Sequence, residues 1–231
     1  CLGHIGESLY KDYEIIVVDE GLERSAQRNI GIKRAKGEFI LWLDSDMMIM
    51  PELIGECVAL CTGNPNFVYI GFPFDAIYIP ERIVTKGFFG YLRDWERQFY
   101  NGSLVDVVRF ARREGFPLFD ETLHGVEDSD WERRLPKHWK KATSKYSFNH
   151  HDKVSFFKYL KKKAYYAQCL GKYKQKNPDD KLLTFKYRCF TVFTENGKWE
   201  RLIKRPDLTL CVIGLLFLRG IIMKWQSWRY K

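Results

Sequence analysis

The sequence predicts an α/β protein with a mostly parallel sheet flanked by helices. Two short apolar runs, at residues 13–19 ("YEIIVVD") and 38–43 ("EFILWL"), have the composition of strands buried on both faces. A helical pattern lies between them at residues 25–36, and another begins at Pro51. Strand, helix, strand and helix in this order are typical of a parallel sheet with helical connections.

Local signals support these elements. Ser25 is suited to cap the first helix, Gly37 to end it, and Pro51 to occupy the first turn of the next. We expect further strands at residues 67–74, 104–110 and 145–149, and further helices at residues 88–100, 127–135 and 155–176.

Composition is that of a folded chain with a basic surface. Of 231 residues, 45% are hydrophobic and 29% charged, so a packed core is expected and disorder is not. The net charge of +9 suits nucleic acid, an anionic membrane surface or phosphorylated substrates, and does not choose among them. We expect a catalytic domain over residues 1–150 and a basic, aromatic helical extension over residues 151–231.

The six cysteines form no CxxC pair and no zinc-site spacing. We interpret all six as reduced thiols, and no secretory signal is visible. The expected location is therefore the cytoplasm, including the inner face of the membrane.

Two carboxylates follow the second apolar run. Asp44 and Asp46 lie two residues apart in "LDSDM", so they are able to point to one side. Ligands bind beyond the carboxyl ends of strands in open α/β sheets, and Mg²⁺ takes one or two carboxylates plus substrate phosphates. The alternative is an acidic turn that caps the helix at Pro51.

A second acidic group begins the expected helix at residues 127–135. Glu127, Asp128 and Asp130 precede Arg133 and Arg134. This order of charges also suits the helix dipole, but it would present a general base at the N-terminus of the helix. His150 and His151 follow later, either as ligands of a metal ion or as loop residues.

Taken in order, three blocks of the sequence resemble the family 2 glycosyltransferases of the GT-A (Rossmann-like) fold. They are "EIIVVDE", "RSAQRNIGIKRAKGEFILWLDSDM" and "FDETLHGVEDSDWERRL". The resemblance extends through most of residues 13–176, with a shortened N-terminal part. It implies inverting transfer of a sugar from a nucleotide diphosphate donor, a UDP-sugar by expectation, to an acceptor hydroxyl.

The resemblance also implies a role for each matching residue. Asp128 would be the catalytic base, and Glu127 beside it would help to bind the acceptor. The donor would be bound by Asp19, Glu20, Arg28, Asn29 and Asp44. A divalent cation, Mg²⁺ or Mn²⁺, would be bound by Asp44, Asp46 and either His150 or His151. The implied partners are a nucleotide sugar and a saccharide or lipid-linked acceptor, as in polysaccharide or glycolipid assembly.

The C-terminal part suggests contact with a membrane surface. Residues 155–176 combine seven lysines with an apolar side, and residues 208–223 are apolar apart from Arg219. A spanning helix needs about 20 apolar residues, so we expect this run to lie on a membrane rather than cross it. Trp225, Trp228 and Tyr230 would be its interfacial anchors. The alternative is a helix docked on the domain.

Other classes of protein remain open. A nucleotidyltransferase with a similar core would also use carboxylate-bound Mg²⁺, but has no need of the base in "VEDSDW". A non-catalytic membrane-surface relative would keep the fold without binding any nucleotide sugar. A nucleic-acid binder fits the charge, but no motif of that class is found, and we expect no nucleic-acid partner.

Overall fold

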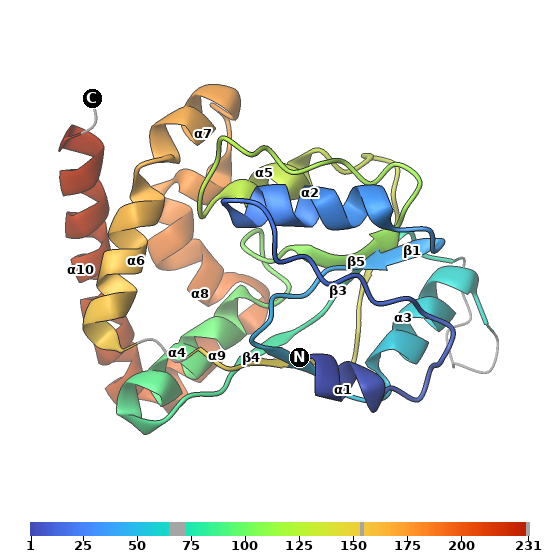
Figure 1. The fold of residues 1–231 in the computed structure, drawn as a ribbon. Helices are drawn as coiled ribbons and strands as arrows, with labels where there is room; N and C mark the ends of the chain where they lie inside the picture. Colours follow the sequence, from blue (N-terminus) through green and yellow to red (C-terminus); the bar gives the residue numbers. More distant parts are fainter. Residues whose placement is uncertain (65–72, 153–154, 230–231) are drawn as a thin grey trace.

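The computed structural model describes residues 1–64, 73–152 and 155–229. The expected strand at residues 67–74 falls almost wholly outside them. Two sheets form the centre of the molecule, and helices cover them (Figure 1). The predicted α/β class and C-terminal helical extension are thereby confirmed.

The strands are short. They are β1 (Phe39–Leu41), β2 (Met47–Ile49), β3 (Ala76–Tyr78), β4 (Glu81–Ile83), β5 (Val108–Arg112), β6 (Lys141–Thr143) and β7 (Phe148–His150). The first sheet has the order β1-β5-β3-β6, and the second has the order β2-β7-β4.

Strand direction differs from the prediction. Among the described strands, β1–β5, β3–β5 and β2–β7 pair antiparallel, whereas β3–β6 and β4–β7 pair parallel. The sheet is therefore mixed, not mostly parallel. Two connections explain the difference. β2 follows β1 after the Asp44–Asp46 turn, without the crossover helix that a parallel neighbour needs. β5 lies between β1 and β3 and runs in the opposite direction to both.

The helices surround these sheets. They are α1 (Leu2–Gly6), α2 (Arg24–Arg34), α3 (Leu53–Thr62), α4 (Gly87–Tyr100), α5 (Glu127–Arg133), α6 (Phe156–Ala167), α7 (Leu170–Lys176), α8 (Val192–Thr194), α9 (Trp199–Lys204) and α10 (Pro206–Arg229). Three short helical turns are η1 (Lys181–Leu183), η2 (Tyr187–Thr191) and η3 (Glu195–Gly197).

Helices form at the expected places, with differences at their ends. Pro51 lies before α3, whose N-cap is Glu52, and α2 ends at Arg34, before Gly37. Glu23, not Ser25, is the N-cap of α2, and Ser25 lies buried inside the first turn. The long helix expected at residues 155–176 is divided at Gln168 and Cys169 into α6 and α7. All six cysteines are free thiols, as predicted.

Residues 13–19 do not form the buried strand that their composition predicts. Ile15 is 47% exposed and Val17 is 62% exposed. The segment belongs to neither sheet of the described residues, and side chains hold it in place. Glu14 accepts hydrogen bonds from the backbone amides of Lys36 and Gly37 at 2.6 and 3.0 Å. A β-branched run becomes a strand only when a neighbouring strand completes its hydrogen bonds, and no described strand does so for this segment.

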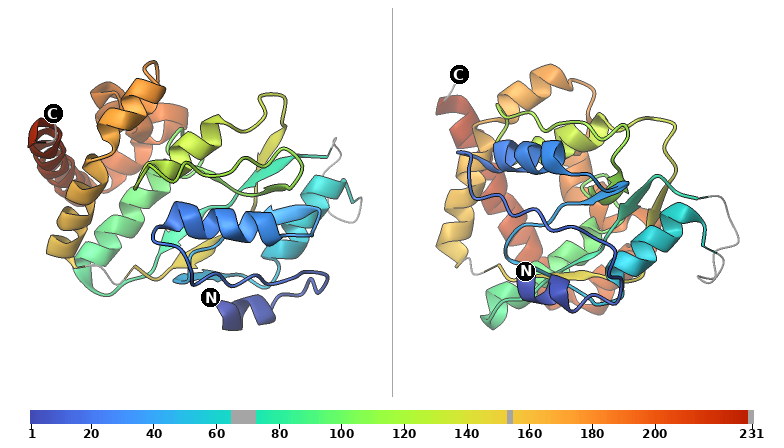
Figure 2. Two further views of the ribbon diagram at one scale, coloured as in Figure 1. Left: turned by 45° about the horizontal axis from the view of Figure 1, so that its top comes forward. Right: turned by 45° about the vertical axis from the view of Figure 1, so that its right-hand side comes forward.

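Helices α6 and α10 lie side by side at one end of the molecule, and α3 lies at the other (Figures 1 and 2). Leu208 and Val212 of α10 enter an apolar cluster with Leu92 and Phe99 of α4. α10 is longer than the sequence analysis assumed. Its segment Pro206–Gln226 is long and apolar enough to cross a membrane by length and composition, so the expectation that the run is too short is wrong.

Candidate active site

Arg28 is at the centre of a polar cluster formed by distant parts of the chain. It projects from α2, and its guanidinium group lies over the ring of Trp42 at 4.2 Å. Its Nη2 donates to Oδ1 of Asp44 at 2.8 Å, and its Nη1 lies 3.5 Å from Oε1 of Glu127. One arginine therefore connects the predicted DSD and EDSD blocks.

Arg109 of β5 lies on the same indole ring, with its guanidinium carbon 3.9 Å from the ring centre of Trp42. It is only 7% exposed, and among the described residues its Nη1 has no hydrogen-bond partner. Burial would raise the pKa of Asp44, but Arg28 and Arg109 outweigh burial and lower it to about 2. Asp44 is therefore ionised throughout the physiological range.

His150 joins Asp46 to Glu81. Its Nε2 lies 3.1 Å from Oδ2 of Asp46, and its Nδ1 lies 2.7 Å from Oε1 of Glu81. Burial would lower the pKa of His150, but the two carboxylates raise it to about 9. Glu81 is also paired with Arg97 at 2.9 Å. The pairing of β2 with β7 places Met47 opposite His150, which explains why Asp46 and His150 meet.

Glu127 is the buried acid of the EDSD block. It is 2% exposed, and Arg24 lies 3.0 Å from its Oε1. Burial, and then the neighbouring charge of Asp128, raise its pKa. Its Oε2 is buried without a partner among the described residues. Asp128, next in sequence, is half-buried, and its Oδ1 accepts a hydrogen bond from the amide of Ser129 at 2.8 Å.

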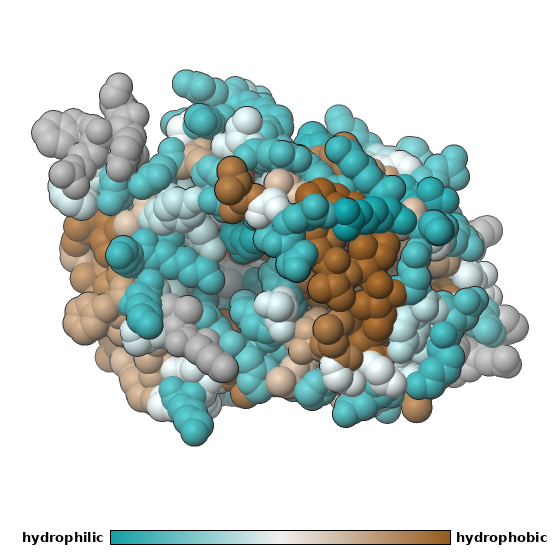
Figure 3. Space-filling model, in the orientation of Figure 1, coloured by the Kyte–Doolittle hydropathy of each residue, from teal (hydrophilic) through white to brown (hydrophobic). Residues whose placement is uncertain are grey.

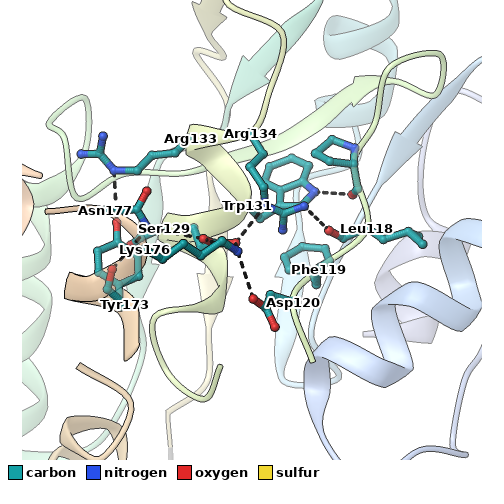
Figure 4. A network of polar contacts seen from close by, with 12 residues as sticks. Leu118, Phe119, Asp120, Ser129, Trp131, Arg133, Arg134, Tyr173, Lys176 and Asn177 are labelled. Atoms are coloured by element: carbon teal, nitrogen blue, oxygen red, sulfur yellow. Dashed lines mark hydrogen bonds and ion pairs between the residues drawn. The ribbon is translucent and has the colours of Figure 1, made fainter. Parts of the chain in front are cut away.

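The rest of the EDSD block anchors α5 to its surroundings (Figure 4). Asp130 lies 2.8 Å from Nζ of Lys176 and 2.9 Å from Nε of Arg134, while Arg134 donates to the carbonyl of Leu118. The ring of Trp131 stacks on Phe119 at 5.2 Å. Asp130 is therefore a structural acid, and these contacts fix the position of Glu127 and Asp128 one turn earlier.

A cavity of about 190 Å³ opens beside Glu127. Its lining residues come from α2, the loop before α5, and α6: Glu23, Arg24, Ser25, Leu123, His124, Glu127, Lys162, Tyr165 and Tyr166. The rings of His124 and Tyr165 stack at 5.8 Å. Three polar atoms of the lining are buried without a hydrogen-bond partner among the described residues: Ser25 Oγ, His124 Nδ1 and Glu127 Oε2. A cavity whose lining holds three unsatisfied polar atoms is suited to a polar ligand with several hydroxyl groups.

Four predicted site residues lie apart from this cluster. Asp19 and Glu20 are exposed, and Glu20 pairs with Arg34 on α2. Both polar atoms of the Asn29 amide are hydrogen-bonded to the backbone of Phe119, at 2.7 and 2.9 Å. His151 meets Asp46 only through its backbone, by donating its N–H to the Asp46 carbonyl at 2.9 Å. Of the two histidines, His150 is therefore the one whose ring reaches Asp46.

Sequence reasoning missed Arg24, Arg109, Glu81 and Tyr166. An arginine within the apolar "VVRF" run was an available signal for Arg109, because a buried strand rarely carries an unpaired charge. Arg24 and Tyr166 had no such signal. They meet across 142 residues of sequence, where Arg24 Nη2 donates to the Tyr166 hydroxyl at 3.1 Å.

The residues that would hold a cation are Asp44 and Asp46, through their carboxylates, and His150, whose Nε2 would first have to release its proton and its contact with Asp46. Within the described part of the chain, no group of three His, Cys, Asp or Glu side chains is already arranged around a metal position. Asp44 is instead held by Arg28 and Asp46 by His150. Two oxygen donors and one imidazole fit a hard divalent cation that takes its other ligands from a diphosphate.

The fold and the cluster define an α/β protein in which arginines, carboxylates and a histidine gather at the end of β1. Residues 2–101 match the model of the family described as Glycosyl transferase family 2, which confirms the resemblance predicted from the sequence. The matched residues include the DSD block and end before the EDSD block. A comparison with curated proteins gives no match.

Solved structures of S. aureus TarS are also similar to this chain. One shares 17% identity at a TM-score of 0.38, covering 88% of this chain and 41% of that chain. A structure of TarS 1–349 gives 16% identity, a TM-score of 0.39, and coverage of 90% and 71%. TarS 1–349 in complex with UDP-GlcNAc gives 15% identity, a TM-score of 0.41, and coverage of 90% and 72%. Scores this low do not establish a shared arrangement of the site.

Proposed function

We propose that this chain is a glycosyltransferase that moves a sugar from a nucleotide diphosphate donor to an acceptor hydroxyl with inversion. The observation that carries the proposal is the position of Arg28. It contacts Asp44 of one family block and Glu127 of another, so that donor-side and acceptor-side groups share one centre. The family match over residues 2–101 supports the same activity.

The donor side would be formed by Arg28, Asp44, Asp46 and His150. A nucleoside diphosphate leaves with negative charge, and a Mg²⁺ or Mn²⁺ ion bound by Asp44 and Asp46 would offset it. Arg28 and Arg109 add two fixed positive charges beside Asp44. Because Arg109 Nη1 has no partner among the described residues, a phosphate oxygen would satisfy it.

The acceptor side would be formed by Asp128, Glu127 and the cavity beside them. Asp128 is the proposed general base, because a carboxylate that removes the hydroxyl proton makes the acceptor nucleophilic. Glu127 and Ser25 line the cavity with unsatisfied oxygen atoms able to bind acceptor hydroxyl groups. The Tyr165 ring supplies a flat face, which suits a saccharide. A UDP-sugar donor and a role in polysaccharide or glycolipid assembly on the cytoplasmic side complete the proposal.

Donor binding tests the proposal directly. UDP, GDP and dTDP are titrated into the protein by calorimetry, once with Mn²⁺ and once with EDTA. We expect binding of one nucleotide to require the cation, and Asp46→Ala to weaken it on the order of tenfold or more. Asp179→Ala, which removes an exposed carboxylate elsewhere, is the matched control and should bind as the parent does.

The outcomes separate the alternatives. Equal affinity in Mn²⁺ and EDTA would disprove the metal-dependent site. Failure to bind any nucleotide under either condition would identify a non-catalytic relative. Release of diphosphate from a nucleoside triphosphate, without transfer of a sugar, would identify a nucleotidyltransferase.

A further inference from the structure

Helix α10 has two apolar sides. The inward side consists of Leu208, Val212 and Leu215, each at most 3% exposed. The outward side consists of Leu210, Ile213, Phe217 and Ile221, which are 51–71% exposed. The first set packs on the protein, and the second has no covering within the described residues.

The one charge in this apolar run turns inward. Arg219 is 9% exposed, and its Nη1 donates to the hydroxyl of Tyr159 on α6 at 2.8 Å. Its Nη2 donates to Glu96 of α4, which is fully buried. The outward side of residues 208–223 is therefore free of charge, although Arg219 lies within this stretch of the sequence.

The helix next to α10 is positively charged on its exposed side. α6 packs along α10, and its Lys158 and Lys161 are exposed. Figure 3 shows the brown side chains of the α10 edge at the left, next to teal side chains of the neighbouring helix. Apolar side chains beside lysines are the combination that binds an anionic lipid surface.

We propose that the outward side of α10 binds the surface of an anionic lipid bilayer, with Lys158 and Lys161 against the headgroups. The helix lies in the interface and does not cross the bilayer. Its inward side is packed on α4 and α6, and a crossing helix would have to break the Arg219–Glu96 pair and expose Leu208 and Val212.

A second copy of the chain fits this surface less well. In a twofold pairing the same patch meets itself, so α10 would face α10. That arrangement brings the lysine-bearing α6 helices of two copies toward each other, within a chain that already carries a net charge of +9. An anionic bilayer complements this charge instead of repeating it.

Vesicle flotation tests the proposal on the full chain. One set of vesicles is neutral phosphatidylcholine. The other contains about one third phosphatidylserine, which makes its surface anionic. The parent should float with the anionic vesicles. Ile213→Gln/Phe217→Gln should lose binding at least about tenfold, because both side chains are exposed and their loss removes apolar contact with lipid. Leu22→Gln, a change at a fully exposed leucine outside α10, is the matched control.

A second variant tests the electrostatic part. Lys158→Glu/Lys161→Glu should reduce binding to anionic vesicles about tenfold and should make it insensitive to salt. Circular dichroism melting should show every variant folded, since none of these side chains is buried. A parent that stays with the soluble fraction at low salt would overturn the proposal. So would a parent dimer, seen by light scattering, that the α10 variant dissociates.

Discussion

Asp128 and Glu127 are neighbours in sequence but differ in surroundings. Glu127 is buried and paired with Arg24, whereas Asp128 is half-buried and bound only to the amide of Ser129 among the contacts described above. A general base must be ionised and accessible to the acceptor, and burial raises the pKa of Glu127. Asp128 is the more accessible of the two carboxylates and is therefore the better candidate for the base.

Asp128→Asn should reduce sugar transfer by about 10² or more while nucleotide affinity stays unchanged, because the amide keeps the shape and cannot take a proton. Glu127→Gln is the comparison, and it should mainly raise the KM for the acceptor. Initial rates at varied donor and acceptor concentrations measure both effects. Retained turnover in the Asn variant would transfer the role of base to Glu127.

Gly125 allows the cavity wall to close around Arg24. Its φ is +79°, and a Cβ placed there would lie 2.1 Å from Cγ of Tyr166. Gly125→Ala should displace Tyr166 from Arg24 and lower acceptor affinity as well as the melting temperature. Gly87→Ala is the matched control, because Gly87 has φ +80° but open space around its Cβ position. The loss of stability in Gly87→Ala therefore measures the backbone strain without a steric clash, about 1–2 kcal/mol. Equal acceptor KM values in the two variants would contradict the role given to Tyr166.

The residue types of the site could be predicted from sequence, but their partners could not. Asp44, Asp46 and Glu127 carry a local pattern, and in the structure Asp44 and Glu127 contact Arg28, and Asp46 contacts His150. Arg24, Arg109 and Tyr166 join through contacts between remote segments, which no local pattern encodes. Asn29 was predicted to bind the donor because it matches the family pattern. In the structure its side-chain amide is instead hydrogen-bonded to the backbone of Phe119.

Among the elements, helices were predicted better than strands. Helices such as α4 and α10 satisfy their own backbone hydrogen bonds, so periodicity and end signals suffice. The strands β2, β3, β4 and β6 have three residues each, too few for a pattern to identify. Residues 13–19 have a clear pattern but no ladder partner in the described sheets. The direction of a strand depends on which other strand pairs with it, and no local sequence pattern identifies that strand.

Helix α6 carries a lysine in an unfavourable place. Burial, followed by Arg93, Arg219 and Arg188, lowers the pKa of Lys163 well below its usual value, while the carboxylate of Glu96 acts in the opposite direction. The rings of Tyr159 and Tyr166 lie 5.4 and 5.7 Å from its ammonium group. A pKa that is lower in the folded state than in the unfolded chain means that folding disfavours the protonated form, so Lys163 destabilises the fold at pH values below the usual pKa of lysine.

Lys163→Met should therefore raise the melting temperature at pH 7, with about 2–4 °C for each kcal/mol gained in a chain of this size. The gain should shrink as the pH rises toward 10.5, the usual pKa of lysine, because the unfolded chain then loses the same proton. Lys172→Met on α7, at an exposed position, should change little at any pH. Differential scanning fluorimetry between pH 7 and 10 follows both variants. A gain that does not vary with pH would show that packing, not charge, is responsible.

At the scale of the whole molecule, α10 serves the core and the surface at once. Leu208 and Val212 complete the apolar cluster of α4, and Arg219 neutralises Glu96 inside it. The outward side would meet the bilayer. One consequence is that the proposed membrane surface and the acceptor cavity are joined by a single helix, because α6 packs on α10 and supplies Lys162, Tyr165 and Tyr166 to the cavity. A lipid-linked acceptor would reach Asp128 by a short path along α6.

Removal of residues 205–231 tests whether the core role is real. The sequence alone left open whether this segment lies on a membrane or docks on the domain. The structure predicts that its loss uncovers Leu92 and Phe99 and leaves Glu96 without Arg219. Each buried aliphatic side chain lost contributes about 1.5–3 kcal/mol, and the buried Glu96 carboxylate loses Arg219 while it keeps Arg93, which adds to the loss. The truncated chain should therefore show a lower urea midpoint and a weaker nucleotide affinity than the full chain. Ile213→Gln/Phe217→Gln is the control, since it removes the proposed lipid contact and should leave the urea midpoint unchanged. A truncated chain that keeps the parent midpoint would mean that α10 is dispensable for folding and that its inward contacts contribute little.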